Sequence, residues 1–320
     1  MNDLIDRMKQ GDRRALSRLL SLVERQDEAS FSVLEALWDS TGKAFVVGVT
    51  GPAGAGKSTF IDQMIRLLRS EKLKVGVIAV DPSSPFSGGA VLGDRVRMQR
   101  HAQDPDVFIR SVGSRGRSGG ISFATRALAQ VMDAYGCDVI LIETVGAGQS
   151  EVEIMNLADA TLVLLMPEAG DSIQALKAGI LEIADVYVVN KMDRPGADRV
   201  VQDIQTMISL APNSRVWETP IHKTEAVGGE GVDAVWESLK RYRVFLETAS
   251  KDESKERKRR WNELIDLAQV KFLSEVSKVD PNSEAYSDAF ASKRANLYRL
   301  VDRLLAQIAS QWSAKAPPRK

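Results

Sequence analysis

The amino-acid sequence predicts an α/β fold built on a doubly wound, mostly parallel sheet. Short apolar runs alternate with amphipathic segments from residue 44 to residue 245. Such runs are typical of strands buried on both faces of a parallel sheet, and the segments between them are typical of its covering helices. The expected strands are Phe45–Val49, Val75–Val80, Val107–Val112, Val139–Ile142, Thr161–Met166, Val186–Val189 and Val216–Ile221.

Helical patterns on both sides of this region divide the chain of 320 residues into three expected parts. These are an N-terminal helical extension (1–43), the α/β domain (44–245) and a C-terminal helical arm (246–320). In the extension, Leu16, Leu19, Leu20 and Val23 recur at the spacing of one helix face. The arm contains two amphipathic helices, which carry Trp261, Leu264, Ile265, Ala268, Phe272 and Val276, and then Tyr286, Phe290, Leu297, Val301, Leu304, Ile308 and Trp312. Their apolar faces must be buried on the α/β domain or against a second copy of the chain.

The composition excludes several classes of function. Lys and Arg total 43, as do Asp and Glu, so the formal net charge is zero. We therefore expect no broad electrostatic binding of nucleic acid or of a membrane surface. Cys137 is the single cysteine, so no intramolecular disulfide can form, and the charged N-terminus lacks an apolar signal core. These features favour a cytoplasmic location.

The segment Gly51–Ser58 reads GPAGAGKS and fits the phosphate-binding pattern G-x-x-x-x-G-K-[ST]. It lies between an expected strand and a helix expected from Ser58 to Leu68, which is the context that the pattern requires. Its glycines permit a tight turn that aims backbone N–H groups at phosphate oxygens. Lys57 can reach the β- and γ-phosphates, and the Ser58 hydroxyl can bind Mg²⁺. The residues expected to contact the phosphates are Gly51, Pro52, Ala53, Gly54, Ala55, Gly56, Lys57, Ser58 and Thr59.

The tetrapeptide Asn190-Lys191-Met192-Asp193 follows a later expected strand and is typical of a guanine site. The Asp193 carboxylate can accept hydrogen bonds from N1–H and the 2-amino group of guanine. Adenine offers neither donor, so its binding would leave a carboxylate unpaired. Asn190 can contact the O6/N7 side of the base, and the Lys191 stem can lie along the ring. Alone, the tetrapeptide fits an ordinary polar strand end as well; after a phosphate loop it predicts a GTPase.

A second base-contact loop is expected before the sequence GGEG, at Glu225, Ala226 and Val227. GTPases usually carry Ser-Ala here, and Glu225 takes the place of the serine. We therefore predict GTP as the substrate, hydrolysed to GDP and phosphate.

Carboxylates at the ends of other strands indicate a magnesium site. Asp81 ends one strand, Asp94 follows in the sequence LGD, and Glu143 ends another. Together with Ser58 they form the expected set of metal ligands. A helix cap is the alternative for Asp81 and for Asp94. Gly146, just after Glu143, can donate its N–H to the γ-phosphate and so sense hydrolysis.

These motifs resemble the MeaB/ArgK family of methylmalonyl-CoA-mutase-associated GTPases, which belong to the SIMIBI class of P-loop proteins. The stretches that carry the resemblance are GPAGAGKST, VDPSSPFSGGAVLGDRVRM, ETVGAGQSEVE, PEAGDSIQALKAGILEIADVYVVNKMD and GGEGV. The resemblance matches Asp81 and Asp94 to magnesium-site acids, Glu143 to the switch II acid, and Asp171 and Lys177 to a third switch. The chain departs from the family at Ala147, where valine is more usual, and at Glu225.

The third switch completes the expected catalytic set of Lys57, Glu143, Asp171 and Lys177. Lys177 could bring positive charge to the transferring phosphoryl group when a partner docks. The alternative is a plain connection between strand and helix, with a capping Asp171 and a solvated Lys177.

The resemblance also implies a homodimer and a function beyond hydrolysis. Members gate the loading of adenosylcobalamin onto an acyl-CoA mutase, such as methylmalonyl-CoA mutase, and the removal of damaged cofactor. An adenosyltransferase is a further implied partner. The chain lacks a D-x-H-x-x-G motif, so we do not expect it to bind cobalamin itself by that mode. Two alternatives are an NTPase or kinase acting on a periplasmic binding protein in transport, and a metallochaperone GTPase.

Overall fold

The computed structural model describes most of the chain. The described residues are 1–81, 99–101, 103–113, 120–144, 154–167, 180–210, 216–248, 253–283, 286 and 296–315. In this part of the chain, no helix is both long and apolar enough to cross a bilayer.

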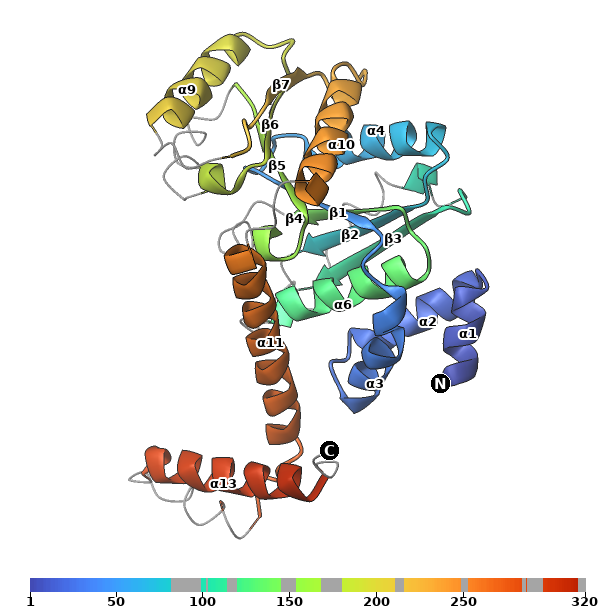
Figure 1. The fold of residues 1–320 in the computed structure, drawn as a ribbon, viewed down its shortest axis with the longest axis vertical. Coiled ribbons are helices and arrows are strands. Elements are labelled where there is room, and N and C mark those ends of the chain that lie inside the picture. Colours follow the sequence, from blue (N-terminus) through green and yellow to red (C-terminus); the bar gives the residue numbers. More distant parts are fainter. Residues whose placement is uncertain are drawn as a thin grey trace.

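The centre of the molecule is a seven-stranded sheet with the order β3-β2-β4-β1-β5-β6-β7 (Figure 1). Every pair of neighbouring strands is parallel, which confirms the predicted fold class. The strands are β1 (Phe45–Thr50), β2 (Val75–Asp81), β3 (Val107–Gly113), β4 (Val139–Thr144), β5 (Ala160–Leu165), β6 (Val186–Asn190) and β7 (Ile221–Thr224).

The expected strand Val216–Ile221 is wrong, because β7 begins only at Ile221. Val216 is 85% exposed, so it is no core residue. The Trp217 ring instead packs edge-on against Tyr242, at a centroid distance of 4.9 Å. Its indole N–H donates to the Asp185 carbonyl, just before β6. Trp217 therefore belongs to an aromatic cluster ahead of the strand.

Helices cover both faces of the sheet. The α-helices in the described part of the chain are α1 (Asn2–Lys9), α2 (Arg13–Val23), α3 (Glu28–Leu37), α4 (Lys57–Ser70), α6 (Gly120–Ala134), α9 (Ala197–Leu210), α10 (Val232–Thr248), α11 (Glu253–Val276) and α13 (Leu297–Lys315). Adjacent strand residues face opposite sides. Val77 and Leu141 belong to the core formed with α4 and α10, whereas Ile78 and Ile142 belong to the core shared with α6 and α1–α3. These two cores hold the sheet from its two sides, and a third core lies between α9 and the strands β5 and β6.

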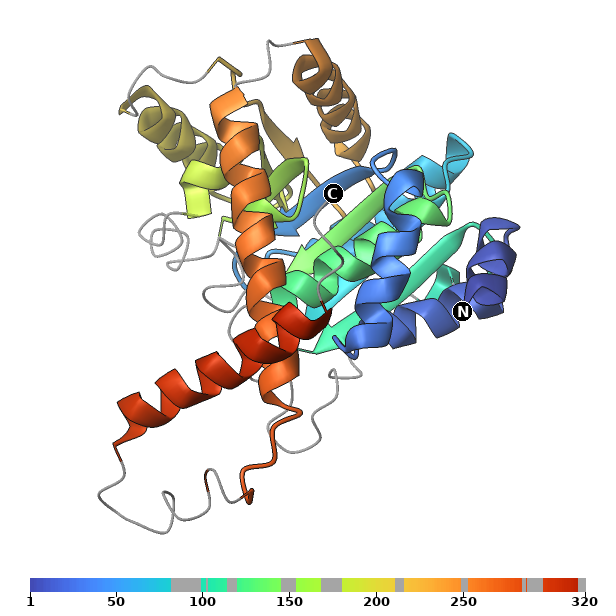
Figure 2. The same cartoon turned by 60° about the horizontal axis from the view of Figure 1, so that its bottom comes forward.

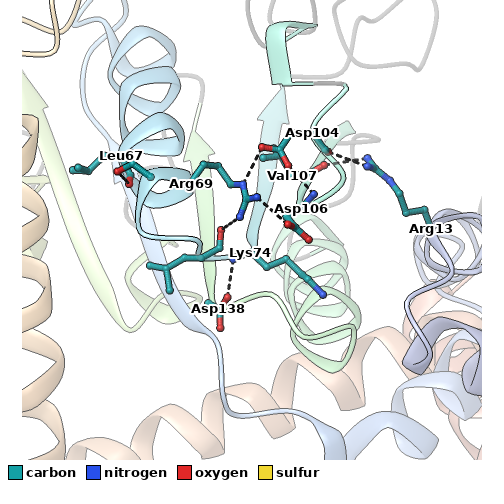
Figure 3. Close-up of polar contacts among 10 residues, drawn as sticks. Arg13, Leu67, Arg69, Lys74, Asp104, Asp106, Val107 and Asp138 are labelled. Atoms are coloured by element: carbon teal, nitrogen blue, oxygen red, sulfur yellow. Dashed lines mark hydrogen bonds and ion pairs between the residues drawn. The ribbon is translucent and has the colours of Figure 1, made fainter.

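The turn before β3 ties α4 to the N-terminal helices (Figure 3). From α4, the Arg69 guanidinium donates to Asp104 at 2.9 Å and to Asp106 at 2.8 Å. From α2, Arg13 donates to the Asp104 carbonyl at 2.9 Å and to the Val107 carbonyl at 3.2 Å. Burial opposes ionisation of Asp104, but hydrogen bonds from Arg69 and from the Asp106 N–H lower its pKa below the ordinary value. The phosphate-loop helix and the N-terminal extension thus share one anchoring point.

The C-terminal helices extend away from the sheet (Figure 1 and Figure 2). α11 packs in part on the α/β domain: Val270 is buried in the core with α6 and α3, and Arg126 of α6 lies 3.6 Å from the Asp266 carboxylate. α13 lies across the end of α11, where Phe272 meets Trp312 at a centroid distance of 6.3 Å. Of the expected second helix, Phe290 lies outside the described residues.

Both helices leave large apolar side chains exposed in this single chain. They are Trp261, Leu264, Ile265 and Leu273 on α11, and Leu297, Tyr298, Val301, Leu305 and Trp312 on α13.

Candidate functional site

The predicted phosphate loop connects β1 to α4 at the carboxyl edge of the sheet. Two of its glycines allow no side chain. At Gly51, φ is +137° and a Cβ would come within 2.0 Å of the Leu164 carbonyl oxygen on β5. At Gly56, φ is +91° and a Cβ would come within 2.4 Å of the Asn190 amide nitrogen. The loop can therefore lie against β5 and β6 only because these positions are glycine.

Lys57 begins α4 and is 7% exposed. Its ammonium donates to the Gly51 carbonyl at 2.7 Å and to the Pro52 carbonyl at 3.1 Å. The positive charge is thus held over the loop and beside the N-terminus of α4. Backbone N–H groups of the first helical turn and the helix dipole favour anions at this end. A phosphate group placed here would meet the ammonium and the helix terminus together.

Ser58 and Glu143 are in direct contact, although they lie far apart in sequence. The Ser58 hydroxyl donates to the Glu143 carboxylate at 2.6 Å, and Glu143 is 4% exposed. Hydroxyl and carboxylate oxygens are the hard ligands that Mg²⁺ prefers. The pair therefore fits one side of a magnesium site. Asp81 ends β2, but its side chain lies outside the described residues, as do Asp94, Gly146, Asp171 and Lys177.

Asn190, the last residue of β6, joins three segments of the site and is 2% exposed. Its amide nitrogen donates to the Ala55 carbonyl in the phosphate loop at 2.8 Å. Its amide oxygen accepts from the Thr224 hydroxyl and from the Ala226 N–H, each at 3.1 Å. The sequence predicted a contact of Asn190 with the base; its contacts in the structure hold the phosphate loop and the second loop together.

Lys191 and Asp193 stand in the turn that follows β6. Lys191 has a left-handed backbone (φ +59°), and its ammonium lies 3.3 Å from the Met166 sulfur after β5. Asp193 is exposed. Its carboxylate is therefore accessible to a ligand, as a base-binding group requires.

The second loop follows β7. Ala226 is buried against Asn190, whereas Val227 is 79% exposed. Gln63 of α4 donates from its side-chain amide to the Val227 carbonyl at 3.0 Å. Sequence reasoning missed Gln63, and no motif around it could have revealed this contact. The contact ties the second loop to the helix that begins at Lys57.

Together these elements form one site at the carboxyl ends of β1, β4, β6 and β7. β1 has β4 on one side and β5 on the other, and ligands of open α/β sheets bind beside such a central strand, where the strand order reverses. The phosphate loop and the Asn190–Asp193 turn at this edge define the P-loop class of α/β nucleotide-binding proteins.

The chain belongs to the MeaB family: the model described as "Methylmalonyl Co-A mutase-associated GTPase MeaB" matches residues 16–280. This confirms the resemblance seen in the motifs. A putative GTPase of Pyrococcus abyssi is 47% identical over 262 residues, which cover 81% of this chain and 81% of that protein. The mouse protein named "Methylmalonic aciduria type A homolog, mitochondrial" is 35% identical over 226 residues, 68% of this chain and 54% of that protein.

A solved structure supports the same fold. The crystal structure titled "LAO/AO transport system kinase" has a TM-score of 0.69 and 26% identity, and the match covers 95% of this chain and 97% of that one. Family and relatives together indicate a P-loop GTPase.

The Asp193 assignment predicts a change of base preference. Asp193→Asn should weaken GTP binding and favour XTP, because xanthine has a carbonyl where guanine has the 2-amino donor. Competition binding measures this preference. Asp198→Asn is the control, since Asp198 is an exposed carboxylate nearby that pairs with Lys223. An unchanged preference for GTP in Asp193→Asn would contradict the assignment.

Proposed function

We propose that this chain binds GTP with Mg²⁺, hydrolyses it to GDP and phosphate, and acts as a chaperone of an acyl-CoA mutase. In this function the GTP state gates the loading of adenosylcobalamin and the removal of damaged cofactor, with methylmalonyl-CoA mutase as the first candidate partner. The nucleotide part is supported by one arrangement above all: the Asn190 amide bridges the phosphate loop and the loop after β7. The mutase part is supported by the family's description and by the mouse relative's name.

The chemistry assigned to the chain's own residues is charge stabilisation. Lys57 would exchange its two carbonyl partners for β- and γ-phosphate oxygens, where its charge offsets the charge that develops during phosphoryl transfer. Ser58 and Glu143, with Asp81 and Asp94, would hold Mg²⁺. When bound, the ion would neutralise phosphate charge and help to align the phosphates.

We further propose that Asp171 and Lys177 act as the third switch. Lys177 would approach the phosphates when the mutase docks, and so speed a hydrolysis that is slow in the free protein. The chain has no glutamine directly after Gly146 that could orient water as in Ras-like proteins. Fast hydrolysis would therefore depend on the positive charge that Lys177 brings when the partner docks.

A transport-associated kinase is the second candidate, because the solved structure that matches nearly the whole chain carries that title. It differs from the first in its partner: a solute-binding protein rather than a mutase.

Partner capture separates these two candidates. Immobilised chain with Mg²⁺ and a non-hydrolysable GTP analogue should enrich an acyl-CoA mutase, and with it an adenosyltransferase, from native lysate. Lys57→Ala loaded in the same way is the control, because weaker phosphate contacts should reduce the capture. The purified mutase should then raise GTP turnover. Capture of a solute-binding protein without any mutase would contradict the mutase proposal.

We also propose that the chain is a cytoplasmic homodimer joined through residues 246–320. The exposed apolar side chains of α11 and α13 support a second copy as the covering partner, since burial of apolar surface drives most association.

Deletion of residues 255–320 should convert a dimer into a monomer that still binds nucleotide. The double substitution Val301→Asp and Leu305→Asp should also give a monomer, with α11 intact. Both side chains are about half exposed in the single chain, at 52% and 45%, so the charges would act on the surface proposed to meet the second copy. Light scattering tests this, and a monomeric full-length chain at micromolar concentration would refute it.

A further inference from the structure

The loop after β7 is closed at its base by backbone hydrogen bonds. The Glu225 N–H donates to the Glu230 carbonyl at 3.0 Å, and the Glu230 N–H donates to the Glu225 carbonyl at 3.1 Å. Between them, Val227 and Gly228 are exposed, so little side-chain packing holds the tip. Exposed loops with few packed side chains open easily. Although Ala226 is buried in the core, polar contacts must therefore constrain this exposed tip. Gln63 does so from α4, and a second constraint comes from within the loop.

The Glu225 carboxylate supplies that constraint from inside the loop. One of its oxygens accepts from the Val227 N–H at 2.9 Å, and the other accepts from the Gly228 N–H at 2.6 Å. Hydrogen bonds to an ionised acceptor are about twice as strong as neutral ones. The fit is close, because a Cβ at Gly228 would come within 2.7 Å of a Glu225 oxygen. The charge of Glu225 is thus directed to its own loop.

The loop held in this way carries the contact on which the base side of the site depends. The N–H of Ala226 lies between Glu225 and Val227 in sequence and donates to the Asn190 amide oxygen. With its oxygen held in this position, the Asn190 amide points its nitrogen toward the Ala55 carbonyl of the phosphate loop. Loss of the loop conformation would therefore release Asn190 from one side.

We propose that Glu225 is a positioning residue for guanine-nucleotide binding: its carboxylate fixes the loop after β7, so that Ala226 and Asn190 are already aligned before the base arrives. This inference rests on the proposed GTP-binding function and adds a residue that acts without touching the nucleotide. A shorter side chain with one oxygen, such as serine, could not accept from the Val227 and Gly228 N–H groups with two separate oxygens.

Glu225→Gln tests the proposal with little change in size. The amide keeps one acceptor oxygen and turns an NH₂ donor toward the second backbone N–H, so one hydrogen bond is lost. The loss should raise KM for GTP about tenfold, with a smaller effect on kcat, because the loop acts on binding of the base rather than on phosphoryl transfer. Hydrogen exchange of the Val227 and Gly228 amides should become faster while exchange in β1 stays unchanged.

Glu230→Gln is the matched control, since it removes the same charge from the exposed side chain at the other end of the loop. It should leave KM within about twofold of wild type, as expected of an ordinary surface substitution. If wild type hydrolyses GTP and Glu225→Gln keeps the wild-type KM, the positioning role is wrong. Equal losses in both variants would show a general charge effect and also overturn it. A wild type that binds no GTP would refute the proposed function itself.

Discussion

The candidate site depends on the buried side-chain amide of Asn190. It donates to Ala55 in the phosphate loop and accepts from Thr224 and Ala226 at the end of β7. A buried amide with its partners in place is costly to disturb, because each lost hydrogen bond leaves a desolvated polar group. Asn190 therefore links the phosphate half and the base half of the site, together with the Gln63 contact from α4 to the second loop. Gly56 is required because a Cβ there would meet the Asn190 amide.

The parallel sheet makes this arrangement possible. Strands β1, β4, β6 and β7 end at the same edge, so residues from four distant parts of the sequence meet there. The same edge brings Glu143 of β4 to Ser58 of α4. On the other side of the molecule, Arg69 and Arg13 fix α4 and α2 to the turn before β3, which holds the helix of the phosphate loop from its far end.

Much of this could be predicted from the sequence, and the exceptions have physical reasons. Continuous apolar runs revealed the buried strands because both faces of the sheet are covered. The expected strand at Val216–Ile221 was wrong because Trp217 packs against Tyr242 rather than in the sheet. The phosphate loop has a short pattern of fixed spacing, so its turn could be read directly. The roles of Asn190, Gln63 and Glu225 depend on which distant backbone groups they meet, and no local pattern contains that information.

GTP turnover tests the central claim, that this edge of the sheet is the site of a GTP hydrolase, most directly. Turnover at saturating GTP with Mg²⁺ should fall at least about tenfold in Lys57→Ala, which corresponds to about 1.4 kcal/mol of barrier. Removal of Mg²⁺ by a chelator should also lower it, whereas Lys9→Ala, at an exposed position on α1, should match wild type. Wild-type turnover in Lys57→Ala would contradict the assignment of the phosphate site.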